Sequence, residues 1–371
     1  MKGDKKQILV CGNYGAGNLG DEAILDGLIS LCSSVWPNSH LTVMSSKPSA
    51  TAHEHKITTV NLFPAGFKSF FKFWFSSNCL RTLKAVGTAD LIILGGGGLF
   101  SDEKWQAVLI WFVQTWWFWL LGKRIVCLAQ SIGPLHSKWA KFITARVFSR
   151  ALVVTVRDTQ SANILAALKI KKVKVLADPA FALGYGNEKA SNVQDQVVLS
   201  LRPWKTENEN FYRQIADTVE WLWHEHKLKT VFIPFQKEID DDRDCYRQVR
   251  RFLEHQDIME MKEVADYKTA LEIIGRSRLV IGMRLHAIIF SVLGTRPFVA
   301  IAYSSKVRNF VADLAMEKFL MEYGSIDSSG LQHLLSNLLK ETKQITDHLN
   351  KEKMQNTYRF FEHEKELNRF L

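Results

Sequence analysis

The chain has 371 residues, of which 47% are hydrophobic and 23% charged, so we expect a folded protein with two domains of ordinary size. Its five cysteines are scattered and form no CxxC pair, which argues against a structural zinc site and favours a reducing compartment. The net charge of +10 comes with no recognisable nucleic-acid module, so we expect an anionic membrane surface or a polyanionic substrate as partner, and no nucleic acid.

The chain opens on a short apolar strand at residues 7–11, directly after a charged start, and no signal peptide is expected. Gly15 to Gly20 then match the dinucleotide pattern GxGxxG, and a helix with apolar residues at helical spacing follows. The next strand, residues 41–44, ends in Ser-Ser-Lys instead of the acidic residue that would hold a ribose, so no dinucleotide cofactor is expected.

Three residues of this first loop are candidates for contact with a substrate. Gly17 and Asn18 are candidate substrate-binding residues, and Asp21 has two interpretations. Asp21 is either a helix N-cap or a carboxylate that orients or deprotonates a sugar hydroxyl.

The first half of the chain contains two aromatic stretches, one of them basic and the other uncharged. Residues 64–84 lie in a segment without acidic residues, and they place Phe67, Phe70, Phe71, Trp74 and Phe75 on one helical face beside Lys68 and Lys72. This pattern is typical of a helix in a membrane interface, and the alternative is a core helix with snorkelling lysines. Residues 105–122 are uncharged and include five Trp; with Gln114 and Thr115 at the centre, we favour a helix buried against the sheet over a membrane span.

Between these stretches, a strand at residues 90–94 ends in four consecutive glycines. A glycine run allows a ligand to approach the backbone, so Gly96 and Gly97 are candidate substrate contacts; the alternative is a tight strand-to-helix turn. Further strands are expected at residues 124–129, 153–156, 173–176, 197–201 and 230–234. Those at 153–156 and 197–201 place Arg157 and Arg202 at strand ends, where ligands bind in parallel α/β sheets. The alternative for Arg157 is a salt bridge with a neighbouring helix.

The alternation of strands and helices predicts an α/β protein with two Rossmann-like domains facing a central cleft. The polar, Gly-containing stretch 184–196 is a plausible linker, so we place the first domain at residues 1–185 and the second at 186–335. Residues 336–371 are charged and helical, and we expect them to pack across the domain junction. The basic excess lies in the first domain, where residues 1–185 hold 21 Lys and Arg against 10 Asp and Glu.

The stretch 278–307 carries the strongest functional signal. A strand at 278–281 leads through a tight turn into a helix that begins near His286, and a second strand at 297–303 leads to a turn with Lys306. Because turns that follow parallel strands share one edge of a sheet, Arg284, His286 and Lys306 are expected to meet there. Together with the helix start, they suit a small substrate that has two anionic groups.

No metal site is expected, because the acidic cluster Asp240–Asp244 is joined by no His or Cys at ligand spacing and is interpreted as a solvated loop or helix start. We also see no convincing carboxylate near Arg284 that could hold the ribose of a nucleotide sugar.

Several of these stretches, taken in order, resemble the polysaccharide pyruvyl transferase family. They include GDEAIL at 20–25, QSIGP at 130–134, RD at 157–158, ADP at 177–179, SLRPW at 200–204, GMRLHA at 282–287 and YSSKV at 303–307. The resemblance covers residues 8–310. It implies a fold similar to the GT-B glycosyltransferases and transfer of a pyruvyl group from phosphoenolpyruvate onto a sugar of a cell-surface glycan precursor, with no cofactor and no metal.

By that resemblance, Arg284, His286 and Lys306 match the positions that the family uses for donor binding and catalysis, and we take His286 as the acid/base. The alternative for His286 is a helix-capping or packed histidine without a chemical role. Arg157 and Arg202 are expected to assist with the donor. The first domain is expected to hold a lipid-linked saccharide acceptor, with the protein peripherally bound to the cytoplasmic face of the cell membrane. The main alternative is a GT-B nucleotide-sugar glycosyltransferase.

Overall fold

The computed structural model describes residues 5–66, 73–103, 105–184, 193–204 and 209–370. Two compact units are formed. Unit 1 comprises Met1–Ala16, Asp21–Ala182 and Asn356–Leu371, and unit 2 comprises Gly17–Gly20 and Leu183–Gln355. The short segment Gly17–Gly20 therefore belongs to unit 2, although the sequence around it belongs to unit 1. The boundary expected at residues 185 and 186 lies outside the described residues.

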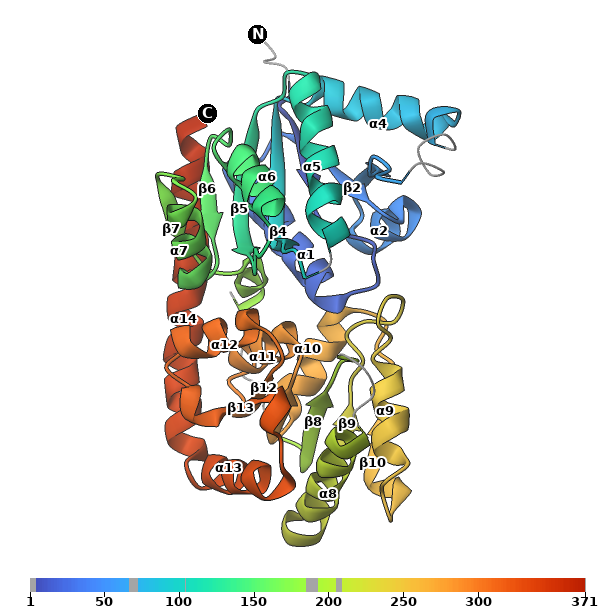
Figure 1. The fold of residues 1–371 in the computed structure, drawn as a ribbon, viewed down its shortest axis with the longest axis vertical. Coiled ribbons are helices and arrows are strands. Elements are labelled where there is room, and N and C mark those ends of the chain that lie inside the picture. Colours follow the sequence, from blue (N-terminus) through green and yellow to red (C-terminus); the bar gives the residue numbers. More distant parts are fainter. Residues whose placement is uncertain (1–4, 67–72, 104, 185–192, 205–208, 371) are drawn as a thin grey trace. The chain divides into compact units, whose positions relative to one another are not determined.

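Unit 1 is built on a seven-stranded parallel sheet in the order β3-β2-β1-β4-β5-β6-β7 (Figure 1). Its strands are β1 (Gln7–Cys11), β2 (His40–Ser45), β3 (Thr58–Asn61), β4 (Leu91–Phe100), β5 (Ile125–Ile132), β6 (Val154–Val156) and β7 (Val173–Val175). Its helices are α1 (Leu19–Val35), α2 (Pro48–His55), α4 (Ser77–Thr88), α5 (Trp105–Leu120), α6 (Lys138–Phe148) and α7 (Thr159–Ala167). Strands β1, β4 and β5 are almost fully buried, as expected for parallel strands covered on both faces.

Unit 2 is built on a six-stranded parallel sheet in the order β10-β9-β8-β11-β12-β13. Its strands are β8 (Gln196–Ser200), β9 (Lys229–Phe232), β10 (Met259–Met261), β11 (Leu279–Gly282), β12 (Phe298–Ala302) and β13 (Leu320–Glu322). Its helices are α8 (Glu209–His226), α9 (Arg243–Arg250), α10 (Tyr267–Arg276), α11 (Leu285–Leu293), α12 (Ser305–Asp313) and α13 (Ser328–Lys340). The prediction of an α/β protein with two Rossmann-like sheets is confirmed.

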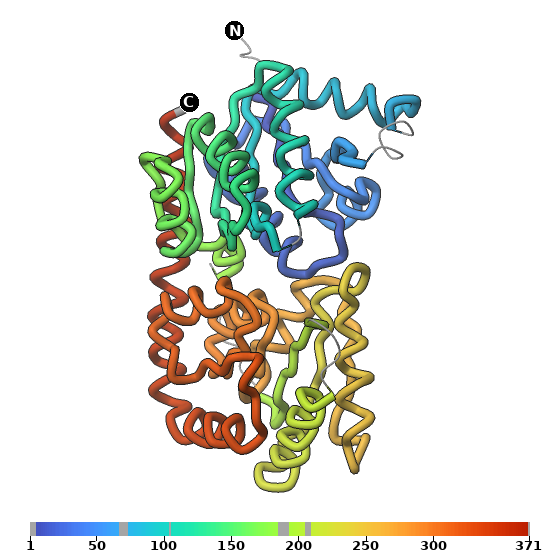
Figure 2. The backbone as a smooth tube through the Cα atoms, viewed as in Figure 1, coloured from blue at the N-terminus to red at the C-terminus, as the bar shows by residue number. Residues whose placement is uncertain are grey.

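The last helix, α14 (Thr342–Leu367), contributes residues to both units. Within unit 1 its C-terminal part, red in Figure 2, lies beside strands β6 and β7. His363 is buried there between the hydroxyl of Thr155, at 3.3 Å, and the carbonyl of Ala177, at 3.2 Å. Burial lowers the pKa of His363 to about 4, so its ring is neutral and serves packing and hydrogen bonding.

The prediction for the glycine run is wrong, and most of the predicted aromatic face at residues 64–84 lies outside the described residues. β4 continues through all four glycines to Phe100, so the run is neither a strand end nor a strand-to-helix turn. A Cβ on Gly96 would lie 2.1 Å from the side chain of Ile24 in α1. The absence of a side chain at Gly96 therefore allows α1 to pack closely on β4. Residues 67–72, which carry most of the predicted aromatic face, lie outside the described residues.

The stretch 105–122 behaves as expected of a helix packed on the sheet. In α5 the side chains of Val108, Trp111, Gln114 and Phe118 are buried. The amide of Gln114 forms hydrogen bonds with both the N–H and the carbonyl of Phe63, at 2.9 and 2.7 Å, which explains a polar residue at the centre of an apolar helix. Among the described helices, we find none with both the length and the apolar character that crossing a membrane requires.

Candidate functional site

The carboxyl edge of the unit 2 sheet gathers polar side chains from β8, β9, β11 and β12. In the strand order of this sheet, β8 and β11 are neighbours, although they are far apart in sequence. Connections on the two sides of such a pair leave in opposite directions, which opens the crevice where parallel α/β proteins bind ligands. The N–H of Met283 donates to the carbonyl of Ser200 at 2.7 Å, and this hydrogen bond closes the pairing just before the loop to α11 begins.

Arg284 occupies the N-cap of α11 and is buried. Its Nε donates to the two carboxylate oxygens of Asp242 at 3.2 and 3.0 Å, and its Nη2 also contacts this carboxylate. The carboxylate of Asp242 is fully buried and also accepts hydrogen bonds from the N–H groups of Phe235 and Gln236, each at 3.0 Å. Burial alone would lower the pKa of Arg284, but the Asp242 carboxylate outweighs burial and raises it.

This ion pair bears on two predictions. Asp242 lies in the acidic cluster that the sequence suggested was solvated, yet it is the most buried carboxylate of the site. From the sequence we also saw no carboxylate near Arg284 that could hold a ribose. A carboxylate does lie beside Arg284, but it is buried, and its oxygens are occupied by Arg284 and by two backbone N–H groups. With Nε and Nη2 held by Asp242, the guanidinium has a fixed orientation, and Nη1 has no partner among the residues that the structure describes. That nitrogen is available to an anionic ligand.

Tyr303 directly follows β12, and its phenol lies near the positive charges of Arg202, Arg284 and Lys306. Its hydroxyl accepts a hydrogen bond from Nη1 of Arg202 at 3.0 Å. Burial by itself would raise the pKa of Tyr303, but the positive charges of Arg202, Arg284 and Lys306 outweigh burial and lower it. Three cations are thus close enough to one phenol to bias its ionisation, and the edge of this sheet is electropositive.

Arg202 is held on an aromatic base. Its guanidinium carbon lies 4.7 Å from the ring centre of Tyr303 and 5.3 Å from that of Trp204, and the two rings are 4.9 Å apart. It also pairs with Asp240 at 3.2 Å. Stacking on two rings restricts the side chain, so its charge is presented at low entropic cost.

Lys306 lies in the first turn of α12, whereas the sequence analysis placed it in a turn after the strand at residues 297–303. The N-cap of this helix is Ser304, whose hydroxyl is buried and forms no cap hydrogen bond. The hydroxyls of Ser304 and of Ser200 have no hydrogen-bond partner within the described part of the chain. Buried hydroxyls without partners are rare in folded proteins, and here they stand at the same sheet edge as the cations.

His286 lies in the first turn of α11 and is packed against Gly20. A Cβ at Gly20 would lie 2.0 Å from Nδ1 of His286, so the imidazole occupies the space that any other residue would need. The segment around Gly20 is held by a bridge between Asn18 and Gln236 and by a hydrogen bond from the N–H of Leu19 to the carbonyl of Phe235, at 3.0 Å. Gly20, the first residue of the GDEAIL stretch, therefore meets the GMRLHA stretch within unit 2.

In unit 1, Asp21 lies in the first turn of α1 and accepts a hydrogen bond from the Asn13 amide at 2.9 Å. Burial raises the pKa of Asp21 to about 6, although the Asn13 hydrogen bond acts in the opposite direction. Gly97 lies next to it, since a Cβ there would be 3.6 Å from the Asp21 carboxylate. A carboxylate with a raised pKa is suited to exchanging a proton near neutral pH.

Arg157 forms an ion pair with Asp178, and its Nε donates to the hydroxyl of Ser131 at 2.8 Å. The ion pair that the sequence left open as an alternative is present, but its partner belongs to a loop and not to a helix. Gly17 adopts a φ of +71°, a conformation that favours glycine, and a Cβ there would lie 3.1 Å from Glu238. Gly17 and Asn18 therefore shape the loop within unit 2.

The residues that the sequence analysis missed are Asp242, Tyr303, Ser200 and Ser304. Ser200 is the last residue of β8, and Tyr303 and Ser304 directly follow β12, so position relative to the strands was the available signal for these three residues. Asp242 follows β9 by ten residues, after a loop, and only the fold brings it to Arg284.

Comparisons with known proteins agree with this architecture. A family model described as polysaccharide pyruvyl transferase matches residues 18–305. The structure of HepE from Anabaena in complex with UDP and glucose is 15% identical, with a TM-score of 0.61, and the match covers 99% of this chain and 100% of that one. The complex of S. aureus MnaA with UDP is 12% identical, with a TM-score of 0.63 and coverage of 95% and 92%.

A UDP-GlcNAc 2-epimerase from Neisseria meningitidis bound to UDP-GlcNAc is also similar, with 12% identity, a TM-score of 0.60 and coverage of 97% of both chains. At these identities, the solved structures establish a shared fold, with two Rossmann-like domains of the GT-B type. The family match spans most of the chain and includes the segments that carry Asp21, Arg284 and His286.

Proposed function

The chain belongs to the polysaccharide pyruvyl transferase family, and we propose that it moves a pyruvyl group from phosphoenolpyruvate onto a sugar of a cell-surface or cell-wall polysaccharide precursor. The observation that carries the proposal is the convergence of Arg202, Arg284 and Lys306 on Tyr303 at one sheet edge. Phosphoenolpyruvate has a carboxylate and a phosphate, so its binding needs cations around a small volume.

The donor contacts are assigned by chemistry. Nη1 of Arg284 is suited to the carboxylate, because the rest of that guanidinium is fixed by Asp242. Lys306 and the N–H groups at the start of α12 are suited to the phosphate, and the hydroxyl of Ser304 lies at the same helix start. A hydroxyl without a protein partner gains a hydrogen bond when phosphate oxygens arrive.

In the proposed reaction, the methylene carbon of the donor gains a proton and its C2 becomes cationic. One sugar hydroxyl forms a C–O bond to C2 and loses its proton, and a second hydroxyl forms the other C–O bond as the C2–phosphate bond breaks. The second proton leaves with phosphate, so the products are the ketal and inorganic phosphate. We assign His286 as the acid that protonates the methylene carbon and Asp21 as a base for a sugar hydroxyl.

Titration calorimetry with phosphoenolpyruvate and with UDP tests the donor. We expect phosphoenolpyruvate to bind and UDP to bind far more weakly. The Lys306→Ala variant should lose at least about tenfold in phosphoenolpyruvate affinity, the loss of one charge-assisted contact. Arg308→Ala is a matched control, because Arg308 is exposed on the same helix and pairs with Glu322. Tight UDP binding without phosphoenolpyruvate binding would favour a nucleotide-sugar glycosyltransferase, the fold-level alternative, and would overturn the proposal.

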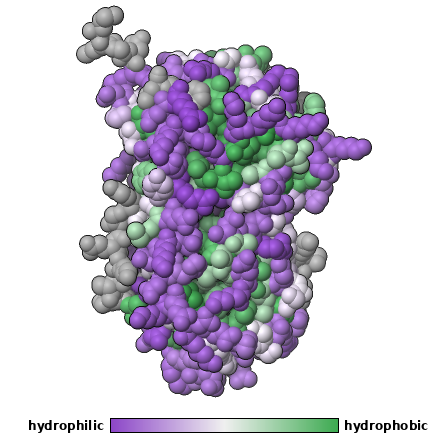
Figure 3. All heavy atoms as spheres, turned by 90° about the vertical axis from the view of Figure 1, so that its left-hand side faces the viewer, coloured by the Kyte–Doolittle hydropathy of each residue, from purple (hydrophilic) through white to green (hydrophobic). Residues whose placement is uncertain are grey.

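We further propose that the acceptor is lipid-linked and that unit 1 binds an anionic membrane surface through α5 and α6. These two helices pack on each other and expose Trp116, Leu120, Trp139 and Phe142. Residues 105–157 contain no Asp or Glu, so the lysines and arginines around these side chains have no acidic neighbours in the same stretch. Figure 3 draws the side of the molecule on which α14 and α7 lie in Figure 1, and it shows hydrophobic side chains among hydrophilic ones on that face.

Exposed Trp and Phe beside cations are suited to the headgroup region of a bilayer, where the rings enter the interface and the cations meet anionic lipids. Liposome flotation tests this surface. We expect the protein to float with vesicles that contain phosphatidylglycerol and to do so less with pure phosphatidylcholine vesicles. Phe142→Glu should abolish flotation, whereas Met354→Glu, which changes another exposed apolar residue, should not. Equal flotation of the two variants would contradict the assignment.

A further inference from the structure

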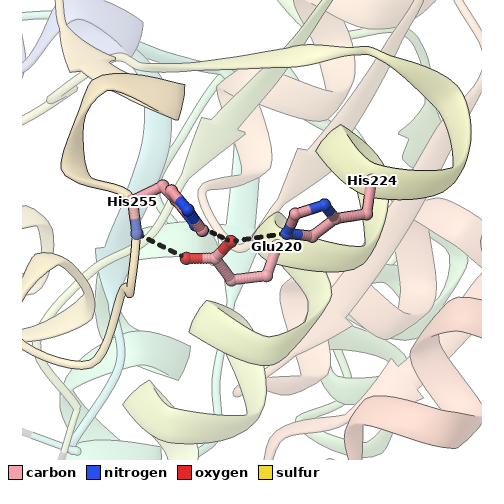
Figure 4. Close-up of side chains that lie close together, drawn as sticks. All are labelled: Glu220, His224 and His255. Atoms are coloured by element: carbon pink, nitrogen blue, oxygen red, sulfur yellow. Dashed lines mark hydrogen bonds and ion pairs between the residues drawn. The ribbon is translucent and has the colours of Figure 1, made fainter.

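Unit 2 carries a cluster of two histidines and one glutamate that is not part of the proposed donor site. Glu220 and His224 lie one turn apart on α8, and His255 precedes the short helix at Gln256–Ile258 (Figure 4). The two imidazole rings are 5.6 Å apart with an angle of 75° between their planes. One ligand atom from each of the three residues lies within 4.8 Å of the other two.

The distances suit a transition-metal ion. Oε2 of Glu220 is 3.4 Å from Nε2 of His224 and 3.4 Å from Nδ1 of His255. A tetrahedral zinc ion with bonds of about 2.0–2.1 Å sets neighbouring ligand atoms about 3.3–3.4 Å apart. A hydrogen bond between an imidazole and a carboxylate is normally shorter than this, with a range of about 2.7–3.2 Å.

The carboxylate is already oriented for such a site. Oε1 of Glu220 accepts hydrogen bonds from the N–H groups of Glu254 and His255, at 2.8 and 3.0 Å. These bonds fix the plane of the carboxylate and leave Oε2 directed at the two rings, as Figure 4 shows. Hydrogen bonds to the second oxygen of a ligating carboxylate are a common feature of metal sites, because they hold the ligand in position.

A second cluster in unit 1 has a similar composition and consists of Glu22, Glu54 and His55. It differs from the first cluster in the protonation of its histidine. Both ring nitrogens of His55 contact carboxylates, at 2.6 Å from Asp26 and 2.9 Å from Glu22. Burial alone would lower the pKa of His55, but these carboxylates raise it to about 9, so the ring is protonated at neutral pH. A protonated imidazole has no lone pair for a metal, and this cluster is an ion pair.

We propose that Glu220, His224 and His255 form a binding site for a divalent transition-metal ion, with zinc as the best match to its nitrogen and oxygen ligands. The three ligands leave one tetrahedral position open, and both histidines are exposed, so water fills that position. The ion connects α8 to the segment between α9 and β10. The nearest ligands from these two segments, His224 and His255, are 31 residues apart in the sequence. Its role is structural, and the site is independent of the proposed transfer reaction.

No metal was expected from the sequence, because it has no Cys pair and no His or Cys at ligand spacing from the acidic cluster. Glu and His at positions i and i+4 of a helix place two ligands on one face, which is a metal-binding spacing. Only the fold supplies the third ligand from a loop.

Zinc titration by calorimetry tests the site, on the full chain prepared without a polyhistidine tag and stripped with a chelator. We expect one zinc ion per chain, no comparable binding of magnesium, and at least about tenfold weaker zinc binding by His224→Ala. His226→Ala is the matched control, since His226 is another exposed histidine of α8 and contacts Trp221 and none of the three ligands. It should bind zinc as the parent does.

A second readout separates binding from folding. Both variants change exposed side chains, so their melting temperatures without metal should equal that of the parent. Zinc should raise the melting temperature of the parent and of His226→Ala, and leave that of His224→Ala unchanged. The proposal is overturned if the parent binds no zinc, or if His224→Ala binds zinc as tightly as His226→Ala does.

Discussion

The buried pair of Arg284 and Asp242 makes the substitution Asp242→Asn a sharp test of the site. The change keeps the size of the side chain and removes its charge. Arg284 then retains a positive charge in a buried position, with no carboxylate to balance it. The N–H groups of Phe235 and Gln236 also lose a charged acceptor.

Removing one partner of a buried ion pair costs about 3–5 kcal/mol, because the other charge stays in a poorly solvated place. In a unit of about 150–250 residues, each kcal/mol shifts the melting temperature by about 2–4 °C. We therefore expect Asp242→Asn to melt at least about 6 °C below the parent. Differential scanning fluorimetry without ligand measures this change directly.

Asp244→Asn is the matched control, two residues further along the same helix. Asp244 is exposed and pairs with the exposed Arg247, so little change in melting temperature is expected. A double variant with Arg284→Gln and Asp242→Asn should lose less than the sum of the two single losses, since the two residues share one interaction. If Asp242→Asn melts no lower than Asp244→Asn, the ion pair does not hold the loop as described.

Three further changes test other parts of the molecule. Gly20→Ala should displace the His286 ring, because the added Cβ would lie 2.0 Å from Nδ1. The rate of phosphate release from the donor should then fall at least about 100-fold. A rate near that of the parent would exclude His286 as the acid. Tyr303→Phe removes the hydroxyl that accepts from Arg202 and should weaken phosphoenolpyruvate binding about tenfold by calorimetry, and unchanged affinity would remove this phenol from the site. His55 stabilises the fold in its protonated form: its contribution is complete below pH 6.5 and is lost as the pH rises toward about 9, so the parent should lose melting temperature over that range. His55→Gln should not show this loss, and a matching loss in the variant would refute the assignment.

The alternation of apolar strands and helices was sufficient to predict both sheets and their class. The strands that were not predicted are β3, β10 and β13, each of which lies at an edge of its sheet. Their residues are only partly buried, so the apolar pattern that identifies a central strand is weak there. The glycine run was misread for a related reason, since glycine in a strand is unusual and its cause, the approach of α1, is a tertiary contact.

The candidate site was predicted in part. Arg284 and Lys306 were identified because each closely follows a strand of a parallel sheet, and the structure places their charges near Tyr303. The sequence could not reveal that Asp242 holds Arg284, because this contact joins residues 42 positions apart. The sequence also could not reveal that Gly20 packs against His286. This contact arises because the segment Gly17–Gly20 belongs to unit 2, whereas the residues on both sides of it belong to unit 1.

Mass spectrometry of the surface glycan made by cells with and without this protein tests the proposed transfer most directly. We expect a pyruvyl increment on the glycan when the parent is present, and none when the protein is absent or carries Lys306→Ala. A glycan of the same mass in all three strains would contradict the account.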